Sequence, residues 1–324
     1  MNIAVTGAGL SGIKVGSLLH KMGHNVTVFE KSRGLGGRLA HRRLNWADID
    51  LGAQYFTARD PDFIKEVNDW CRQGSASLWN FTPYCVRDNQ LSASPDDTLR
   101  YIGQPLMNQP VHHLAAGMTL KLGVTINQVV RKDKWILYGA NEALFSGFDW
   151  LIMTQPAEQA RKLLQGVSDI VTSIPDTVHE PCWALGLGTL GNVPEEIQGI
   201  FGDSTVRWAS RLSSRPGFQN GAGVDDVWML HFASEWSERQ GKQTEVNIAQ
   251  AGTLWLQNLL GRSVKPVHEY CHFWRYASIK SNEQATAYKV DESQKLALIG
   301  SWCSGGRVEG AWLSAISLFN DLFR

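Results

Sequence analysis

Residues 2–30 read NIAVTGAGLSGIKVGSLLHKMGHNVTVFE, and this stretch decides the fold. Its apolar run at 2–6 predicts a short buried strand, the periodic segment that follows predicts a helix ending near Met22, and residues 25–29 predict a second strand. Three glycines with the spacing G-x-G-x-x-G join the first strand to the helix. This order of elements is typical of a dinucleotide-binding unit.

The glycines of this motif are Gly7, Gly9 and Gly12, and each has a physical role. Gly7 allows the tight turn, Gly9 lets the backbone approach a pyrophosphate, and Gly12 lets helix and strand pack closely. The phosphates then lie at the helix N-terminus, where free N–H groups and the helix dipole favour negative charge. Glu30 follows Gly12 by 18 residues, near the roughly 20 expected for an acid that accepts from ribose hydroxyls. The competing interpretation, a glycine-rich loop of an unrelated α/β domain, does not explain Glu30 at that spacing.

The composition predicts an ordinary globular protein with room for two packed cores. The chain has 324 residues, of which 43% are hydrophobic and 19% charged. Lys+Arg and Asp+Glu number 31 each, which disfavours binding to nucleic acid or to an anionic membrane. No apolar run approaches the roughly 18 residues of a membrane helix. Thirteen tryptophans suit a protein that encloses a large aromatic ligand.

Five cysteines, odd in number and without a C-x-x-C pair, predict reduced thiols in a cytoplasmic protein. The first predicted strand begins at the second residue, so we expect no signal peptide. Spacings typical of metal ligands are absent, and no metal site is expected. The cysteines are Cys71, Cys85, Cys182, Cys271 and Cys303.

A second strand–turn–helix pattern closes the chain. Residues 295–299 predict a strand, and residues 300–310, GSWCSGGRVEG, form a glycine-rich bend. Trp312, Ile316 and Phe319 then recur at helical spacing. We therefore expect a second helix N-terminus that faces a ligand.

The middle of the chain changes character. Residues 150–154 predict a buried strand and 157–164 a helix, which together indicate a return to the first sheet. Between 166 and 265, strand-like runs and an amphipathic helix predict an antiparallel sheet domain. A second G-x-G-x-x-G at 186–191 is followed by Asn-Val-Pro, so no helix starts there and we expect no second nucleotide site.

The sequence thus predicts an α/β fold, with a Rossmann-type dinucleotide-binding domain and a second, antiparallel-sheet substrate domain. We expect the first domain to comprise residues 1–72, 111–165 and 266–324. The substrate domain is expected to comprise residues 73–110 and 166–265.

After Glu30 the sequence continues into Gly36-Gly37-Arg38, a turn that NAD-only dehydrogenases have no reason to carry. With this extension the chain resembles the flavin-containing amine-oxidase superfamily. Within it, the chain is most similar to the renalase branch, especially its small bacterial members. Three strings carry that resemblance: DLGAQYF at 50–56, WRYA at 274–277 and GGRVEGAWLS at 305–314.

The resemblance implies an FAD-binding domain, with non-covalent FAD, and a substrate domain over the isoalloxazine ring, as in amine oxidases and p-hydroxybenzoate hydroxylase. It implies oxidation of 2- and 6-dihydro isomers of NAD(P) to NAD(P)+, with oxygen as acceptor and hydrogen peroxide as product. The expected partners are this dihydronicotinamide nucleotide and oxygen, without nucleic acid or membrane. The alternatives are an amine oxidase or desaturase acting on a small amine, a flavin-binding sensor without turnover, and a plain NAD dehydrogenase.

The resemblance also implies roles at the cofactor. Arg38 reaches a phosphate, with a surface ion pair as the competing interpretation. Gln54 and Tyr55 approach the ring or the pocket wall, and the last helix directs its N-terminus at the flavin N1/O2 edge. The expected cofactor residues are Gly7, Gly9, Leu10, Ser11, Gly12, Glu30, Lys31, Gly37, Arg38, Gln54, Tyr55, Gly300, Ser301, Arg307, Val308, Glu309 and Ala311.

The expected catalytic residues are Tyr55, Trp274, Tyr276 and His231. Trp274 and Tyr276 flank the substrate ring, or form an aromatic cage for an amine; packing in a core is the competing interpretation. His231 and Arg275 are candidates for gripping an anionic or amide group. A histidine on a strand is, however, often only hydrogen-bonded inside the fold.

Two residues depart from the family pattern. Ser301 stands where related flavoproteins often carry an acid for the ribityl chain, so that hydrogen bond is expected to be weaker or water-mediated. Phe273 stands where close renalases are expected to carry a basic residue. Cys303 lies near the predicted flavin region, but a covalent cysteinyl flavin is not expected.

Overall fold

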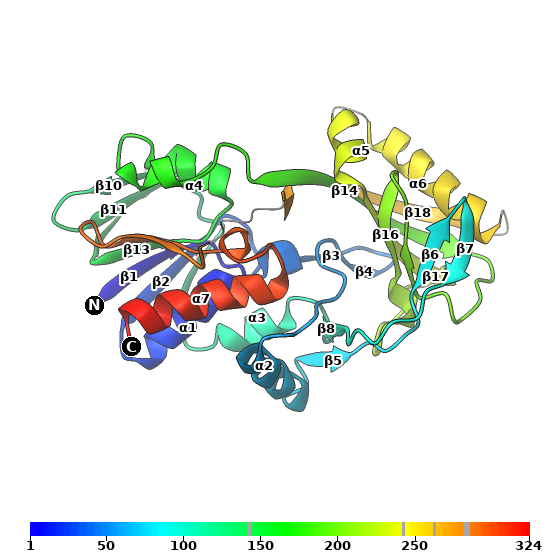
Figure 1. Ribbon diagram of the computed structural model, residues 1–324, viewed down its shortest axis with the longest axis horizontal. Helices are drawn as coiled ribbons and strands as arrows, with labels where there is room; N and C mark the ends of the chain where they lie inside the picture. Colours follow the sequence, from blue (N-terminus) through cyan, green and yellow to red (C-terminus); the bar gives the residue numbers. More distant parts are fainter. Residues whose placement is uncertain (141–143, 242–243, 262–263, 281–285) are drawn as a thin grey trace.

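The computed structural model describes residues 1–140, 144–241, 244–261, 264–280 and 286–324. The chain forms two lobes that lie side by side along the long axis of the molecule (Figure 1). We call them the Rossmann lobe, which contains both termini, and the sheet lobe. Strand β14, His179–Leu190, runs from the junction of the lobes into the sheet lobe (Figure 1).

A six-stranded sheet with the order β19-β20-β13-β1-β2-β9 forms the Rossmann lobe. Its strands are β1 (Asn2–Thr6), β2 (Asn25–Glu30), β9 (Thr119–Leu122), β13 (Trp150–Met153), β19 (Lys289–Asp291) and β20 (Leu296–Leu298). β1 pairs in parallel with both β2 and β13, as a βαβ unit requires, and β19 is antiparallel to β20. The predicted return of residues 150–154 to the first sheet is therefore confirmed.

Both faces of this sheet are covered, which explains its nearly continuous apolar strands. The covering elements are α1 (Leu10–Lys21), α4 (Ala157–Leu164), α7 (Val308–Leu322), β10 (Ile126–Arg131), β11 (Trp135–Gly139) and β12 (Leu144–Phe148). Helices α1 and α7 pack on the face that carries Ile3 and Val5. Helix α4 and the three-stranded sheet β10-β11-β12 cover the face that carries Ala4 and Leu151. This arrangement confirms the predicted α/β class.

The sheet lobe contains a seven-stranded sheet with the order β18-β14-β17-β16-β15-β6-β7. Its strands, besides β14, are β6 (Tyr84–Arg87), β7 (Gln90–Ala93), β15 (Gly199–Phe201), β16 (Val206–Arg211), β17 (Asp226–Phe232) and β18 (Lys265–Ile279). The pairs are antiparallel except for β15 with β6. Helix α6, Glu245–Leu260, packs on one face through Ile248 and Leu256. The expected antiparallel second domain is thus present.

A hairpin from the N-terminal part of the chain covers the other face of this sheet. It consists of β3, His41–Arg43, and β4, Asp48–Asp50. Trp46 and Ile49 of the hairpin pack against Met229 of β17. The hairpin therefore ties the two lobes together.

The second glycine motif lies largely inside β14 and begins no helix, as expected. A Cβ on Gly186 would lie 2.6 Å from Ile49 Cδ1, and a Cβ on Gly188 would lie 3.1 Å from the Trp46 ring. These glycines let the hairpin lie close to the sheet. Packing, and not phosphate binding, accounts for them.

Further helices and strands complete the two lobes. They are α2 (Pro61–Arg72), α3 (Gln109–Leu114), α5 (Ser234–Arg239), β5 (Ala76–Leu78) and β8 (Tyr101–Gly103). Of these, α2, α3, β5 and β8 lie with the core of the Rossmann lobe, and α5 packs on β14. Asp60 caps α2 by accepting from the N–H groups of Asp62 and Phe63 at 2.9 and 3.1 Å. Among the described residues, no helix has the length and apolar character needed to cross a membrane.

Strand pairing divides the chain differently from the expected domain bounds in two places. Residues 266–279, expected in the FAD-binding domain, form most of β18 at the edge of the sheet lobe. Ala76 and Ile102, expected in the substrate domain, lie in the core of the Rossmann lobe. β18 is a mostly half-buried edge strand, so its sequence carries little apolar signal to show which sheet it joins.

Candidate cofactor and substrate site

The N-terminus of α1 is open to a ligand. Gly9 is its N-cap residue, with extended backbone and no side-chain cap, and its carbonyl accepts from Ile13 N at 3.0 Å. A Cβ on Gly12 would lie 2.1 Å from the Gly7 oxygen, so only glycine fits there. A Cβ on Gly9 would meet nothing closer than Gly37 Cα, at 4.0 Å. Uncapped N–H groups therefore adjoin space that an anion can occupy.

The second glycine-rich turn lies directly against the first. Gly36 N donates to the Ala8 carbonyl at 2.9 Å, and Gly9 and Gly36 form a parallel bridge. Gly36 and Gly37 have φ values of +118° and +56°, where glycine is favoured. A Cβ on Gly37 would lie 3.2 Å from Gly9 Cα. The structure thus brings Gly37 to the expected phosphate turn.

Glu30, at the end of β2, lies beside the same turn. Its Oε2 accepts from Ala8 N at 2.9 Å, and its Oε1 accepts from Ser32 N at 2.8 Å. A carboxylate oxygen can accept more than one hydrogen bond, so Glu30 keeps capacity for a ribose hydroxyl. The Lys31 side chain next to it is exposed.

Arg38 points at the C-terminal bend and does not form the surface ion pair considered above. Its Nη2 donates to Ser301 Oγ at 2.6 Å, and its Nη1 donates to the Ala277 carbonyl at 2.9 Å. Burial lowers the pKa of the Arg38 guanidinium. Ser301 is buried, and the adjoining Gly300 N donates to Ser314 Oγ at 3.0 Å. The expected cofactor residues of the two glycine-rich regions therefore lie together.

The N-terminus of α7 meets that of α1. Ser11 Oγ donates to the Ala311 carbonyl at 2.7 Å, and the two helices lie side by side (Figure 1). Arg307 is the N-cap residue of α7, and no side chain caps this helix end. Leu10 and Val308 begin the two helices. Two helix N-termini, each with a positive end of its dipole, thus adjoin one region.

The side chain of Glu309, a residue expected at the cofactor, is directed at the segment before α2. Its Oε1 accepts from the backbone N–H groups of Arg59 and Asp60, at 2.6 and 2.7 Å, and the residue is 9% exposed. The carboxylate therefore fastens α7 to the segment that enters α2. Its place in the first turn of α7 also suits the helix dipole, which is why the sequence pattern alone could not distinguish the two roles.

Replacing Glu309 with alanine is expected to lower the free energy of unfolding by about 1–3 kcal/mol, because two backbone N–H groups lose their acceptor. Urea denaturation of the cofactor-free protein measures this loss. Glu196→Ala, which removes an exposed carboxylate in the sheet lobe, is the control and should have little effect. Unchanged stability combined with weaker cofactor binding would contradict the structural role of Glu309.

Aromatic and imidazole side chains gather on the face of the seven-stranded sheet that is turned towards the Rossmann lobe. We call this group the aromatic face; it consists of Tyr55, Trp208, His231, His272 and Trp274. Trp208 and His231 are cross-strand partners. The Tyr55 ring meets the Trp208 ring edge-on at 5.3 Å, and the His272 and Trp274 ring centroids are 4.6 Å apart. Three of the four expected catalytic side chains, those of Tyr55, His231 and Trp274, thus share one surface.

The carbonyl of Leu51 holds two members of the aromatic face. His231 Nε2 lies 2.9 Å from this oxygen, and Trp274 Nε1 donates to it at 3.0 Å. Burial lowers the pKa of His231 to about 4, so its imidazole is neutral near pH 7. Since a carbonyl can only accept, Nε2 carries the proton and Nδ1 presents a lone pair. His231 is therefore suited to accept a hydrogen bond, for example from an amide.

Tyr276 is not paired with Trp274. Its ring lies edge-on to the His179 ring, with centroids 5.8 Å apart, and His179 Nδ1 is 2.7 Å from Glu158 Oε2. The Trp274 ring instead contacts His272. Trp274 and Tyr276 thus each contact a histidine, and their two rings do not contact each other in the part of the chain that the structure describes.

Phe273 and Arg275 point to the opposite side of β18, since side chains alternate along a strand. The Phe273 ring packs on Trp183, with centroids 4.9 Å apart, in the core beneath α5 and α6. Arg275 is exposed. Phe273 thus stabilises the lobe, and Arg275 is not brought to the aromatic face.

Cys303 is buried, and burial raises the pKa of its thiol to about 12. A thiol so hard to deprotonate is a poor nucleophile, in line with the expected non-covalent cofactor. Within the described parts of the chain, no cluster of His, Cys, Asp and Glu is arranged to hold a metal ion.

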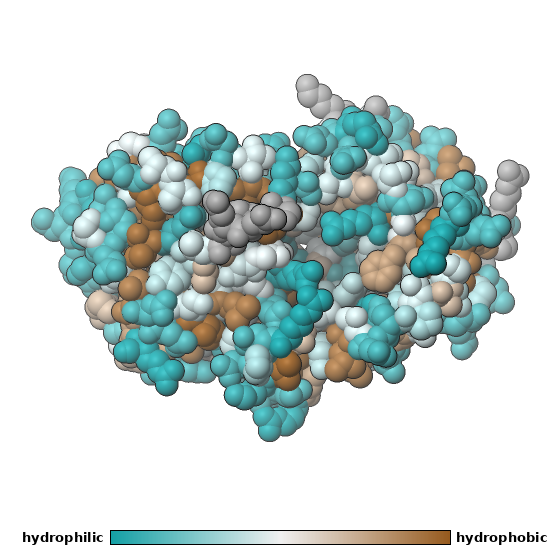
Figure 2. Space-filling model, in the orientation of Figure 1, coloured by the Kyte–Doolittle hydropathy of each residue, from teal (hydrophilic) through white to brown (hydrophobic). Residues whose placement is uncertain are grey.

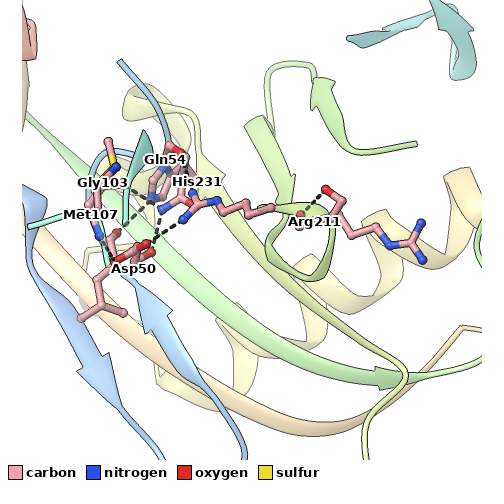
Figure 3. Close-up of polar contacts among 10 residues, drawn as sticks. Asp50, Gln54, Gly103, Met107, Arg211 and His231 are labelled. Carbon is pink, nitrogen blue, oxygen red and sulfur yellow. Dashed lines mark hydrogen bonds and ion pairs between the residues drawn. The ribbon is translucent and has the colours of Figure 1, made fainter. Parts of the chain in front are cut away.

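The sequence does not predict the buried polar network that lies behind the aromatic face. Arg215 Nη1 donates to Asp50 Oδ2 at 2.6 Å, and its Nη2 donates to Gln54 Oε1 at 2.7 Å. Gln54 Nε2 donates to the Asp50 carbonyl at 2.6 Å. Figure 3 shows Asp50 and Gln54 close to His231. The amide of Gln54 is thus engaged inside the protein and does not face the expected flavin ring.

The sequence also does not predict the position of Arg100, which lies behind Tyr55. It is 3% exposed and forms a double hydrogen bond with Asp96, at 2.9 and 2.6 Å. Its guanidinium lies over the rings of Tyr55 and Phe81, 5.4 and 5.2 Å from their centroids. It therefore supports the wall of which Tyr55 is part. Only the approach of distant segments creates this contact, so no local pattern predicts it.

The open α1 N-terminus belongs to the Rossmann lobe, and the aromatic face belongs mainly to the sheet lobe. Figure 2 shows the surface hollowed between the lobes on the face that it draws. The hairpin β3-β4 and residues 50–56 connect the two sets of side chains. A ligand that reaches from the phosphate turn to the aromatic face would lie along this junction.

Comparison with known proteins gives two kinds of similarity. Residues 5–72 match the NAD(P)-binding Rossmann-like domain family. Over 71 residues the chain is 35% identical to 4,4'-diapophytoene desaturase of Staphylococcus aureus, a match that covers 22% of this chain and 14% of the desaturase. The match thus spans only a small part of either protein.

Two solved structures share the fold over the whole chain. The putative protoporphyrinogen oxidase of Exiguobacterium sp. 255-15 aligns with a TM-score of 0.78 and 10% identity, over 99% of this chain and 98% of that one. Cyclohexylamine oxidase of Brevibacterium oxydans aligns with a TM-score of 0.76 and 10% identity, over 100% and 99%. The two-lobed fold is therefore shared with both of these proteins.

Proposed function

We propose that this protein is an FAD-dependent oxidoreductase that oxidises 2- and 6-dihydro isomers of NAD(P) to NAD(P)+. The observation that carries the proposal is the meeting of two uncapped helix N-termini, those of α1 and α7, beside glycine-rich turns that residues 50–56 connect to the aromatic face. The dinucleotide-binding family matched at 5–72 supports the cofactor class. The shared fold with proteins named oxidases supports the reaction class.

The residues present fit non-covalent FAD. The space in front of Gly9 and the free N–H groups of α1 would accept its pyrophosphate, and Glu30 would accept from the adenosine ribose. The pair formed by half-buried Arg38 and buried Ser301 lies between the phosphate turn and the C-terminal bend, where the ribityl chain would pass. The N-terminus of α7 would stabilise negative charge on the N1/O2 edge of the ring.

FAD held by these residues would supply the chemistry of hydride acceptance from the substrate and two-electron transfer to oxygen, with hydrogen peroxide as the product. The chain itself has to orient the substrate. A dihydropyridine that loses hydride becomes an aromatic cation, so no acid or base is needed. A neutral His231 and the flat side chains Tyr55 and Trp274 suit this task, since they hold a planar ring and accept from a carboxamide N–H without proton transfer.

Absorbance spectroscopy of the purified protein, with anaerobic titration, tests the proposal. We expect a yellow protein whose flavin band is bleached by 6-dihydro-NAD and which forms hydrogen peroxide when oxygen is admitted. Bleaching by cyclohexylamine instead would establish an amine oxidase and overturn the proposed substrate. A yellow protein that no reductant bleaches would indicate a sensor, and a colourless protein that binds no added FAD would overturn the proposed cofactor.

A further inference from the structure

A buried ion pair joins the two lobes directly behind the aromatic face. Arg215, which follows β16, and Asp50, which ends β4, are each 6% exposed. Arg215 Nη1 donates to Asp50 Oδ2 at 2.6 Å, and Asp50 Oδ1 accepts from Met107 N at 3.1 Å. Figure 3 shows Asp50 and Met107 together, with Arg211 separate from them. Nothing in the proposed reaction uses this pair directly.

We propose that Arg215 is a positioning residue. It holds residues 50–54, which we call the Leu51 turn, so that the Leu51 carbonyl keeps His231 and Trp274 in place relative to the cofactor turn. This inference rests on the proposed function for its kinetic readout, and on the hydrogen bonds of the turn for its structural readout.

The side chains of Arg215 and Gln54 donate hydrogen bonds to the inward-facing backbone carbonyls of the Leu51 turn. Arg215 Nη2 donates to the Gln54 carbonyl at 2.5 Å and to its Oε1 at 2.7 Å. Gln54 Nε2 donates to the carbonyls of Asp50 and Gly52, at 2.6 and 2.9 Å. The Leu51 carbonyl is the one that faces the sheet, where His231 and Trp274 bind it. The network thus determines the direction in which the Leu51 carbonyl points.

The other side of the Leu51 turn lies on the cofactor turn. Ala53 N donates to the Arg38 carbonyl at 2.9 Å, and a Cβ on Gly52 would lie 1.9 Å from that same oxygen. Leu51 N donates to the Ala40 carbonyl at 3.1 Å. One short turn therefore contacts both the Gly37-Arg38 turn and the aromatic face, and its position sets the distance between them.

The presence of arginine at position 215 favours a role in orienting the groups that it binds. Arginine presents two fixed N–H pairs, which here bind the side chain of Asp50 and the backbone of Gln54, whereas a lysine would act as a single point charge. Its guanidinium also lies over the Trp79 ring, 5.3 Å from the centroid. Burial raises the pKa of Asp50, and the charge of Arg215 opposes that rise. A buried pair of this kind often adds little net stability over apolar residues, so orientation is the property that it supplies.

Arg215→Met tests the inference, and Arg211→Met is its matched control. Arg211 forms a similar ion pair in the same lobe, with Nε 2.6 Å from Asp226 Oδ1, but does not contact the Leu51 turn. Because Arg215→Met leaves Asp50 buried without its cation, the double variant Asp50→Asn, Arg215→Met is made as well. It removes both charges, and we expect its thermal midpoint to be close to that of the wild-type protein.

Two readouts are measured on the full chain. The rate of anaerobic flavin reduction by 6-dihydro-NAD is expected to fall at least about tenfold in both Arg215 variants, and less than about threefold in Arg211→Met. Hydrogen exchange of the Trp274 indole N–H, assigned by its loss in Trp274→Phe, is expected to become at least about tenfold faster in both Arg215 variants and to stay unchanged in Arg211→Met.

The two readouts distinguish failure of the positioning role from failure of the proposed function. Unchanged indole exchange and unchanged reduction in the double variant would overturn the positioning role, as would an equal loss in Arg211→Met. Faster exchange in a protein that 6-dihydro-NAD never reduces would support the positioning role while overturning the proposed function.

Discussion

Replacing Gly9 with alanine is expected to weaken FAD binding at least about tenfold without destabilising the protein. Gly9 has φ −75° and ψ 178°, a conformation that alanine adopts readily. An added Cβ would meet only Gly37 Cα, at 4.0 Å, within the protein. It would, however, occupy the space in which a pyrophosphate approaches the first turn of α1. Fluorescence titration of the cofactor-free protein with FAD measures the loss of affinity.

Two other glycines provide the controls for Gly9→Ala. Gly34→Ala adds a methyl group in the same region with no atom within 4 Å, and should bind FAD as the wild type does. Gly12→Ala places a Cβ 2.1 Å from the Gly7 oxygen, so it should lower both stability and affinity. Equal affinity for FAD in Gly9→Ala and Gly34→Ala would show that no phosphate lies at Gly9.

The N-terminal unit could be predicted because its signals are local. The strand, the glycine motif and the helix all lie within residues 2–30, and Gly12 is required by its contact with the Gly7 oxygen inside that unit. The terminal helix was predicted for the same reason, from apolar residues at helical spacing that face the sheet. A short-range repeat of apolar residues is sufficient to predict a helix when only one face of that helix is buried.

The polar network and the true contacts of Glu309 could not be predicted, because they depend on long-range approach. Arg215 and Asp50 are 165 residues apart, and Glu309 and Arg59 are 250 residues apart. A buried acid such as Asp50 needs a partner, but the sequence does not show which of its cations supplies it. The same uncertainty explains why Gln54 was expected at the cofactor, although its amide is bound inside the Leu51 turn.

His231→Gln is expected to reduce the loss of stability that the protein suffers on acidification. The pKa of His231 is about 4 in the folded protein, against 6.5 for a free histidine. Above pH 6.5 both states are neutral and His231 contributes no pH dependence. Between about pH 6.5 and 4 only the unfolded state takes up the proton, so wild-type stability falls with pH, by about 3 kcal/mol over the whole range.

Urea-denaturation curves at neutral pH and near pH 4.5 measure this difference. Glutamine can donate to the Leu51 carbonyl but takes up no proton, so His231→Gln should lose less stability than the wild type between the two conditions. Trp274→Phe is the control, because it removes the other donor to the Leu51 carbonyl without a titratable group and should lower stability equally at both pH values. Parallel pH dependence of the wild type and His231→Gln would mean that the imidazole is not held neutral in the aromatic face. Its Nδ1 would then be unavailable as the acceptor that the proposed substrate geometry requires.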